Sequence, residues 1–157
     1  MEVELEKKFA DMIRSSRVAG LGTLRNGAPL VSLVAYLPED DFSAFYVHVS
    51  QLAQHTQGML ADARVGLLIS KADDGRPDPQ TLARISILGT AERIDLDDTN
   101  YPSIRSRYIS RFPQSAPLFG FGDFGLWQIV PQSARFVAGF AQAFNLTLDA
   151  LKRVAKS

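Results

Sequence analysis

Hydrophobic residues recur along this chain with two different periods, and the change of period separates helices from strands. Near the N-terminus the period is helical, and the apolar stripe consists of Leu5, Phe9, Met12 and Ile13. This pattern predicts a first helix that ends near Ser15. From residue 17 onward the chain changes to short runs rich in β-branched and aromatic residues, which predict strands.

The first three of these runs predict consecutive antiparallel strands. They cover residues 18–24, 30–36 and 44–49. Asn26-Gly27 lies between the first two runs, and this pair tolerates the positive φ angles of a tight hairpin turn. A polar segment at residues 38–41 makes a longer connection to the third.

The middle of the chain predicts one short helix and two further strands. The helix covers about residues 52–62, and Ser50 is positioned to cap its start. Residues 65–70 predict a buried strand, and a long strand follows from about residue 82 to 94. Gly89 interrupts this long strand, so we expect a bulge or a close backbone approach that bends it around a barrel.

The last third of the chain predicts two helices and two strands. The first helix follows residues 97–99, ends at Pro113, and has an apolar stripe of Tyr101, Ile104, Tyr108 and Phe112. Two final strands are expected at 124–130 and 134–140 across a turn at 131–133, with a closing helix near 148–154. Six or seven mostly hairpin-connected strands predict one mainly β domain over residues 1–157, an antiparallel barrel with peripheral helices.

Composition narrows the class of protein further. Lysine plus arginine and aspartate plus glutamate each total 17, so the formal charge is zero, and we expect neither a nucleic-acid nor a membrane-surface partner. There is no cysteine, which excludes disulfides and thiolate chemistry. No apolar run approaches the roughly 18 residues of a membrane helix, and the acidic N-terminus lacks a signal-peptide pattern. The expected location is cytoplasmic.

Three residues are the main candidates for chemistry. His48 lies within a predicted strand, where a ligand contact and a hydrogen-bonded structural role are equally open. His55 lies in the first turn of a predicted helix beside Gln54 and Thr56, a polar helix start at which backbone amides could hold an anion. A solvated helix start is the alternative, which the residues alone slightly favour. Arg84 alternates with apolar residues on a strand and faces either solvent or a negative partner, with exposure the simpler interpretation.

An aromatic cluster is a further candidate, because it could cover a ring system. It consists of Phe119, Phe121, Phe124 and Trp127, although such clusters more often belong to a core. No serine–histidine–aspartate arrangement, P-loop or Gly-x-Gly-x-x-Gly motif is present. From residues alone, the prediction is a barrel with a candidate site for an anionic ligand.

Three segments in order resemble a known family. They are PLVSLVAY (29–36), FYVHVSQLAQHTQGMLADARVGLLI (45–69) and ARISILGTAERI (83–94). Together they resemble the FMN-binding split barrels related to pyridoxamine-phosphate oxidase. Within that family they are most similar to the small branch that includes the N-terminal domain of haem-utilisation proteins. Segments 107–113 and 121–140 also look like that branch, so the resemblance covers about residues 8–155. It implies an antiparallel, Greek-key-like split β-barrel.

The resemblance also implies a set of cofactor contacts. The strand from Pro29 to Val34 corresponds to the family strand that lies along the flavin, with Ser32 as its polar contact. The ribityl contacts correspond to His48, Val49 and Ser50; the phosphate contacts to Gln54, His55 and Thr56; and the contact at the ring edge to Arg84.

The function implied by the resemblance is an FMN-dependent oxidoreductase, with haem or a deazaflavin as lesser alternatives for the cofactor. It also implies a homodimer that holds the cofactor in a groove between two barrels. Oxidases of the family carry basic residues at the phosphate turn and a C-terminal segment with arginine and histidine, and this chain has neither. Typical pyridoxamine-phosphate oxidase activity is therefore not expected. The alternatives are a non-catalytic module that binds flavin or haem, and a structural dimer whose ligand site has decayed.

Overall fold

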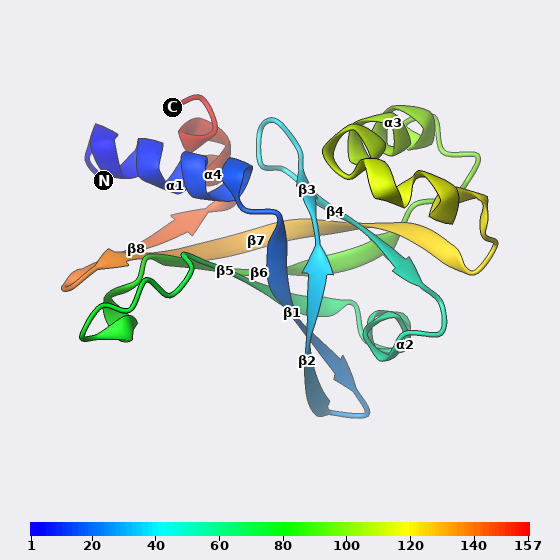
Figure 1. Ribbon diagram of the computed structural model, residues 1–157, viewed down its shortest axis with the longest axis horizontal. Helices are drawn as coiled ribbons and strands as arrows, with labels where there is room; N and C mark the ends of the chain where they lie inside the picture. Colours follow the sequence, from blue (N-terminus) through cyan, green and yellow to red (C-terminus); the bar gives the residue numbers. More distant parts are fainter.

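One curled antiparallel sheet forms the centre of the computed structural model, which describes residues 1–157 (Figure 1). Its strands are β1 (Val18–Arg25), β2 (Ala28–Ala35), β3 (Leu37–Pro38), β4 (Phe45–Ser50), β5 (Arg64–Ser70), β6 (Arg84–Arg93), β7 (Phe124–Gly139) and β8 (Gln142–Thr147). Their order in the sheet is β2-β1-β5-β6-β7-β4-β3, and β8 pairs with the far end of β7. The predicted mainly β split barrel is confirmed.

Four helices and two short 3-10 segments surround the sheet. They are α1 (Val3–Ser15), α2 (Gln54–Ala61), η1 (Pro79–Thr81), α3 (Tyr101–Arg111), η2 (Pro113–Gly120) and α4 (Leu148–Val154). Helices α1 and α4 lie together at one end of the sheet, whereas α3 and η2 lie at the other end (Figure 1). None of the helices is long and apolar enough to cross a membrane.

Two local predictions about the backbone are confirmed. Asn26 and Gly27 have φ angles of 53° and 77°, and Arg25 pairs directly with Ala28, so they form the expected hairpin turn. At Gly89 the register between β6 and β7 shifts, and a Cβ added there would lie 2.4 Å from the carbonyl oxygen of Val130. The glycine is therefore required by a close approach of two backbones at a bulge.

The predicted turn at residues 131–133 is wrong, because β7 continues through it as one strand of 16 residues. Pro131 pairs with Gly89 and Ser133 with Leu88, so Gln132 is the extra residue of the bulge. A proline, which lacks an N–H donor, is tolerated in a sheet at such a bulge. The real turn follows Gly139 and includes Ala141 with a φ of 59°, and it leads into β8, a strand that the sequence pattern did not predict.

The two faces of the sheet are buried to different extents. The inner face and helices α1 and α4 enclose a core of 29 buried residues, in which the rings of Phe9 and Phe136 lie 5.2 Å apart. On the outer face, a smaller cluster of seven buried residues lies under α3. The predicted burial of residues 65–70 is correct for one face only, because Leu68 on the other face is exposed.

Candidate functional site

A groove of about 290 Å³ opens between β2 and β4, where the curled sheet does not close. Helix α2 lies at its end, and Tyr108 of α3 and Phe124 of β7 contribute aromatic walls. The groove brings together five of the residues predicted from the sequence: Val34, His48, Val49, Ser50 and His55. Its volume is near the lower end of the range for small-molecule sites.

Helix α2 begins without a side-chain cap, so the capping role predicted for Ser50 is wrong. The helix starts at Gln54 after Ala53, which has no side chain able to cap it. Ser50 lies too early in the chain, and its Oγ instead accepts a hydrogen bond of 3.1 Å from the amide of Leu52. The Thr56 hydroxyl donates to the carbonyl oxygen of Ser50 at 2.6 Å, which fastens the helix start to β4.

The uncapped start leaves backbone donors free beside the groove. The amides of Gln54, His55 and Thr56 donate to no acceptor in the chain. Unpaired amides and the positive end of the helix dipole both attract anions. This end of the groove is therefore suited to a phosphate or carboxylate group.

A polar pair lies next to these amides. Ser32 Oγ of β2 and His55 Nδ1 of α2 are 3.1 Å apart and share one hydrogen bond. Burial lowers the pKa of the His55 imidazole below its ordinary value of 6.5. At neutral pH the groove therefore offers donors and a dipole, with no fixed positive charge.

His48 occupies an aromatic setting on β4. Its ring stacks on Phe119 of η2 at 3.8 Å and an interplanar angle of 5°, and Tyr108 and Phe124 flank it. Neither ring nitrogen has a hydrogen-bond partner, so this is not a hydrogen-bonded structural histidine. Burial lowers the pKa of the His48 imidazole to about 4. The ring is therefore neutral near pH 7 and behaves as part of the aromatic wall.

Arg84 is not brought to the groove within one chain. It pairs with Val137 of β7, whereas the groove residue His48 pairs with Leu126 of the same strand. Eleven residues of strand separate these two positions on β7, on the order of 30 Å. The Arg84 guanidinium donates to the backbone carbonyls of Gln80 and Leu82 at 2.7 and 3.2 Å.

The remaining predicted residues contribute little through their side chains. Gln54 is exposed, and the Thr56 hydroxyl is already used in fastening the helix, so each offers chiefly its amide. Tyr108 was expected only as part of a helical stripe, and its place in the groove wall was not predicted from the sequence. Phe119 and Phe124 belonged to the aromatic cluster considered as a cover for a ring. That cluster was the signal in the sequence that could have located the aromatic wall of the groove, although its Trp127 belongs to the core.

The fold and the groove together define a ligand-binding split β-barrel. Its groove has flat apolar walls and a helix end that attracts anions. These features suit a planar ligand with one negatively charged arm.

Comparison with known proteins supports this class. The chain is 34% identical over 118 residues to the chloroplastic haem oxygenase HOZ of Arabidopsis thaliana, a match that covers 75% of this chain and 34% of the plant protein. It is 20% identical to the haem oxygenase HutZ of Vibrio cholerae over 96% of this chain and 86% of HutZ. No protein-family model matches the chain.

Solved structures extend the comparison. A haem-binding protein from Mycobacterium smegmatis superposes with a TM-score of 0.83 and 25% identity, over 98% of this chain and 61% of that protein. A Clostridium acetobutylicum protein of the pyridoxinephosphate oxidase family has the same fold, with a TM-score of 0.72, 15% identity and coverage of 96% and 99%. The chain thus spans about a third of the plant protein and about three-fifths of the mycobacterial one.

The chain therefore has the split-barrel fold that pyridoxamine-phosphate-oxidase-like proteins and HutZ share.

Proposed function

We propose that this protein binds FMN in the groove between β2 and β4, as a homodimer, and acts as a flavin-dependent oxidoreductase. The observation that carries the proposal is the uncapped start of α2, which leaves three amides free beside Ser32 and His55. Three amides converging with a helix dipole are a common way to hold a phosphate. The fold family supplies the second support, because FMN binding is what the sequence resemblance implies.

The rest of the groove fits a flat ring system. Val34 and Val49 offer apolar surface, and Phe124 and Tyr108 offer aromatic surface. When bound, the flavin itself would supply the hydride- or electron-transfer chemistry. The residues of this chain would orient the ring, exclude water from it and hold its phosphate.

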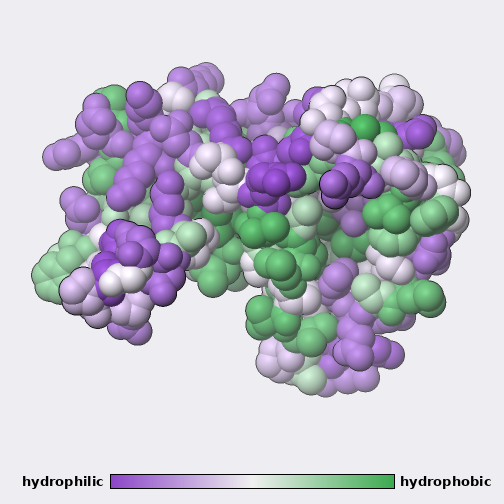
Figure 2. All heavy atoms as spheres, viewed as in Figure 1, coloured by the Kyte–Doolittle hydropathy of each residue, from purple (hydrophilic) through white to green (hydrophobic).

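A second copy of the chain is proposed because half of the outer face of the sheet is uncovered. Val31 and Leu33 of β2 are 77% and 71% exposed, and Leu88 of β6, which lines a shallow hollow together with Val31, is 61% exposed. Apolar side chains gather over β2 in Figure 2. A contiguous exposed apolar surface of this kind marks an interaction site. Leu33 also lines the groove, so a partner on this face would cover the cofactor.

The dimer would also explain Arg84. It lies on the same outer face as Leu88, four residues along β6, and it forms no ion pair within its own chain. The groove has no fixed positive charge, although FMN carries a dianionic phosphate and a ring that becomes negative on reduction. A partner's arginine meeting the groove would supply this charge, as the resemblance implied for Arg84.

A second candidate is that the same groove binds haem. The support is that the relatives HOZ and HutZ are named haem oxygenases. The chemistry of the groove is compatible with haem as well, because a helix start with free amides attracts carboxylates as well as phosphates. The shared requirement is a planar ring with an anionic arm, so binding must be compared directly.

The test is to titrate the purified chain with FMN, riboflavin and haemin. FMN should bind at least about tenfold more tightly than riboflavin, because hydrogen bonds to a charged phosphate are worth about 1.5–3 kcal/mol. This preference should increase at acidic pH, where His55, whose pKa burial lowers below 6.5, gains a proton, and protonation of the phosphate near pH 6 should limit the increase. His55→Gln should weaken FMN and remove the pH dependence without changing riboflavin affinity, while Gln54→Ala, a neighbour with an exposed side chain, serves as control.

Each result separates the candidates. Equal affinity for FMN and riboflavin at every pH would contradict the phosphate assignment. Saturable haemin binding without flavin binding would replace FMN by haem. Reduction of the bound flavin by NADH or NADPH would support an oxidoreductase, and its absence with both donors would favour a storage or sensing module.

A further inference from the structure

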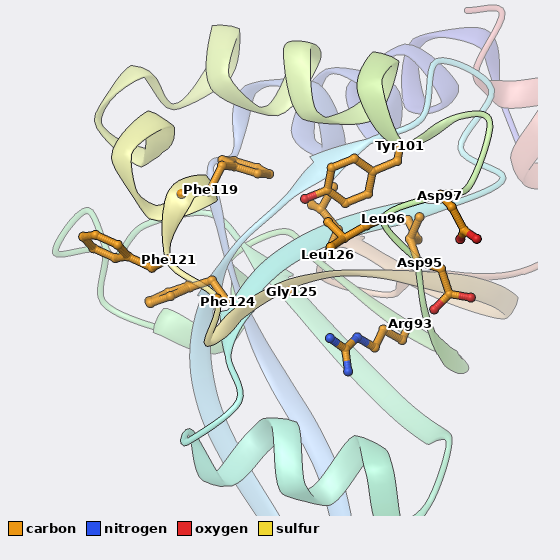
Figure 3. A pocket seen from close by; sticks show the side chains of 13 residues that line it. Arg93, Asp95, Leu96, Asp97, Tyr101, Phe119, Phe121, Phe124, Gly125 and Leu126 are labelled. Atoms are coloured by element: carbon orange, nitrogen blue, oxygen red, sulfur yellow. The ribbon is translucent and has the colours of Figure 1, made fainter.

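A second cavity lies outside the cofactor groove. It has a volume of about 730 Å³ and lies where the end of β6, the start of β7 and η2 meet (Figure 3). It shares a single residue, Phe124, with the groove. A ligand in this cavity would therefore lie close to a residue that also lines the cofactor groove.

The walls of this cavity are aromatic. Phe119 comes from η2, Phe124 from the start of β7 and Phe121 from the link between them, and Gly125 leaves the cavity open beside them. Phe121 is exposed at the cavity, although aromatic side chains are usually buried. Such walls suit a flat apolar ligand rather than a sugar or a polar chain.

An unpaired guanidinium lies at the opposite side from these rings. Arg93 forms no hydrogen bond and no ion pair within the chain, and its side chain points toward Gly125 in Figure 3. A Cβ added to Gly125 would lie 3.7 Å from Arg93 Nε and 3.9 Å from Trp127 Nε1. The guanidinium therefore lies beside the only tryptophan of the chain. The Tyr101 hydroxyl also points into the cavity and has no partner.

The other charges of the cavity limit the ligand's charge. Asp95 and Asp97 also line it, but their carboxylates point away from the Arg93 guanidinium (Figure 3). Two negative charges against one positive charge disfavour a dianion such as a phosphate ester. A single carboxylate can still form a two-pronged hydrogen-bonded pair with the guanidinium fork.

We propose that this cavity binds an aromatic monocarboxylate, with its ring against the phenylalanines and its carboxylate on Arg93. The role of this ligand as the oxidoreductase substrate rests on the proposed function, whereas its binding does not. The contact through Phe124 would place the ligand next to the cofactor groove.

The test uses 3-phenylpropionate as the probe, with 3-phenylpropanol and phenyl phosphate for comparison. Binding to the full chain, with and without FMN, is measured by calorimetry and by the fluorescence of Trp127. The carboxylate should bind at least about tenfold more tightly than the alcohol, because a charged hydrogen-bonded pair is lost in the alcohol. It should also bind more tightly than phenyl phosphate, and it should change the Trp127 emission.

Two variants test the assignment to Arg93. Arg93→Gln should weaken 3-phenylpropionate at least about tenfold and leave 3-phenylpropanol unchanged. Arg25→Gln removes an exposed arginine at the β1–β2 hairpin and should change neither ligand. Circular dichroism checks that both variants fold, and the comparison of carboxylate with alcohol in the unaltered chain does not depend on them.

The outcomes also separate this inference from the proposed function. Flavin binding without any heat or fluorescence change from 3-phenylpropionate would overturn the carboxylate site alone. Binding of 3-phenylpropionate without flavin or haemin binding would support the site and contradict the proposed function. Equal affinity for the carboxylate and the alcohol, or no effect of Arg93→Gln, would overturn the role given to the guanidinium.

Discussion

The outer face of the sheet has two halves that differ in how they are covered. At the β4 end, α3 packs against Tyr46, Ile94 and Leu126, and its own Ile104 and Tyr108 complete a buried cluster. At the β2 end, the corresponding outward positions of β2, β5 and β6 carry exposed leucines and valine. Both halves belong to one continuous sheet with the same alternation of side chains.

The two halves differ in coverage because of the path that the long connection between β6 and β7 takes. The segment between β6 and β7 contains α3 and η2, and it packs over β3, β4 and the start of β7. The Arg107 guanidinium holds α3 there through two hydrogen bonds to Glu39, of 2.9 and 3.1 Å. No segment of the chain covers the outer face of the β2 half, although this half carries exposed leucines and an exposed valine. One chain thus completes its core on one side and leaves a surface suited to a partner on the other.

The largest effect should come from matched leucine truncations in the two halves. Leu126→Ala removes a fully buried side chain from the covered half and should lower the free energy of unfolding by about 2–5 kcal/mol. Leu33→Ala in the bare half should cost the isolated chain no more than about 0.5 kcal/mol. Urea denaturation at low protein concentration measures both. Similar losses for the two variants would show that the halves are not covered differently in solution.

Dimerisation, unlike the stability of the isolated chain, should depend on the bare half. Leu33→Glu places a charge on the bare half and should weaken dimerisation at least about tenfold, because an unpaired carboxylate would have to be buried in the interface. Val3→Glu is the control, since Val3 on α1 is 75% exposed against 71% for Leu33 but lies at the other end of the molecule. Sedimentation velocity at several concentrations measures the change. A monomeric unaltered chain at micromolar concentration would contradict the dimer outright.

The smallest expected effect is the contribution of His48, at the boundary between the two halves, to the pH dependence of the free energy of unfolding. Burial lowers its pKa from 6.5 to about 4, so the unfolded chain takes up a proton there before the folded chain does. The resulting stability is present above pH 6.5 and is lost as the pH falls toward 4. Because solvent screens the partly exposed ring, the loss should be about 1 kcal/mol.

His48→Phe keeps a ring stacked on Phe119 but cannot titrate. Urea unfolding at pH 7 and pH 4.5 should therefore show a smaller loss of stability in this variant than in the unaltered chain. The carboxylates titrate in both proteins and cancel in the comparison. Equal losses in the two proteins would mean that His48 takes up its proton equally in the folded and unfolded states.

Much of the fold and part of the site could be predicted from local pattern. Alternation identified the strands that carry the groove, and Asn26-Gly27 and Gly89 identified a hairpin and a bulge from backbone chemistry alone. The resemblance added a residue set, and the structure gathers five of its members around one groove. These features depend on residues close in sequence, whose conformational preferences do not require contacts with distant segments.

Other features were decided only by tertiary structure. Pro131 predicted a turn because proline lacks an N–H donor. The bulge opposite Gly89 accommodates this proline, so β7 continues as a strand and pairs with β8. Helix α2 begins at Gln54, after a turn that follows Ser50, so Ser50 lies too early in the chain to cap it. The amides at the helix start therefore remain free to attract an anion. The distance between Arg84 and the groove, and the choice of which half of the sheet α3 covers, depend on contacts between segments far apart in sequence. Local periodicity carries no information about such contacts, because it records which face of an element is apolar and not what will pack against it.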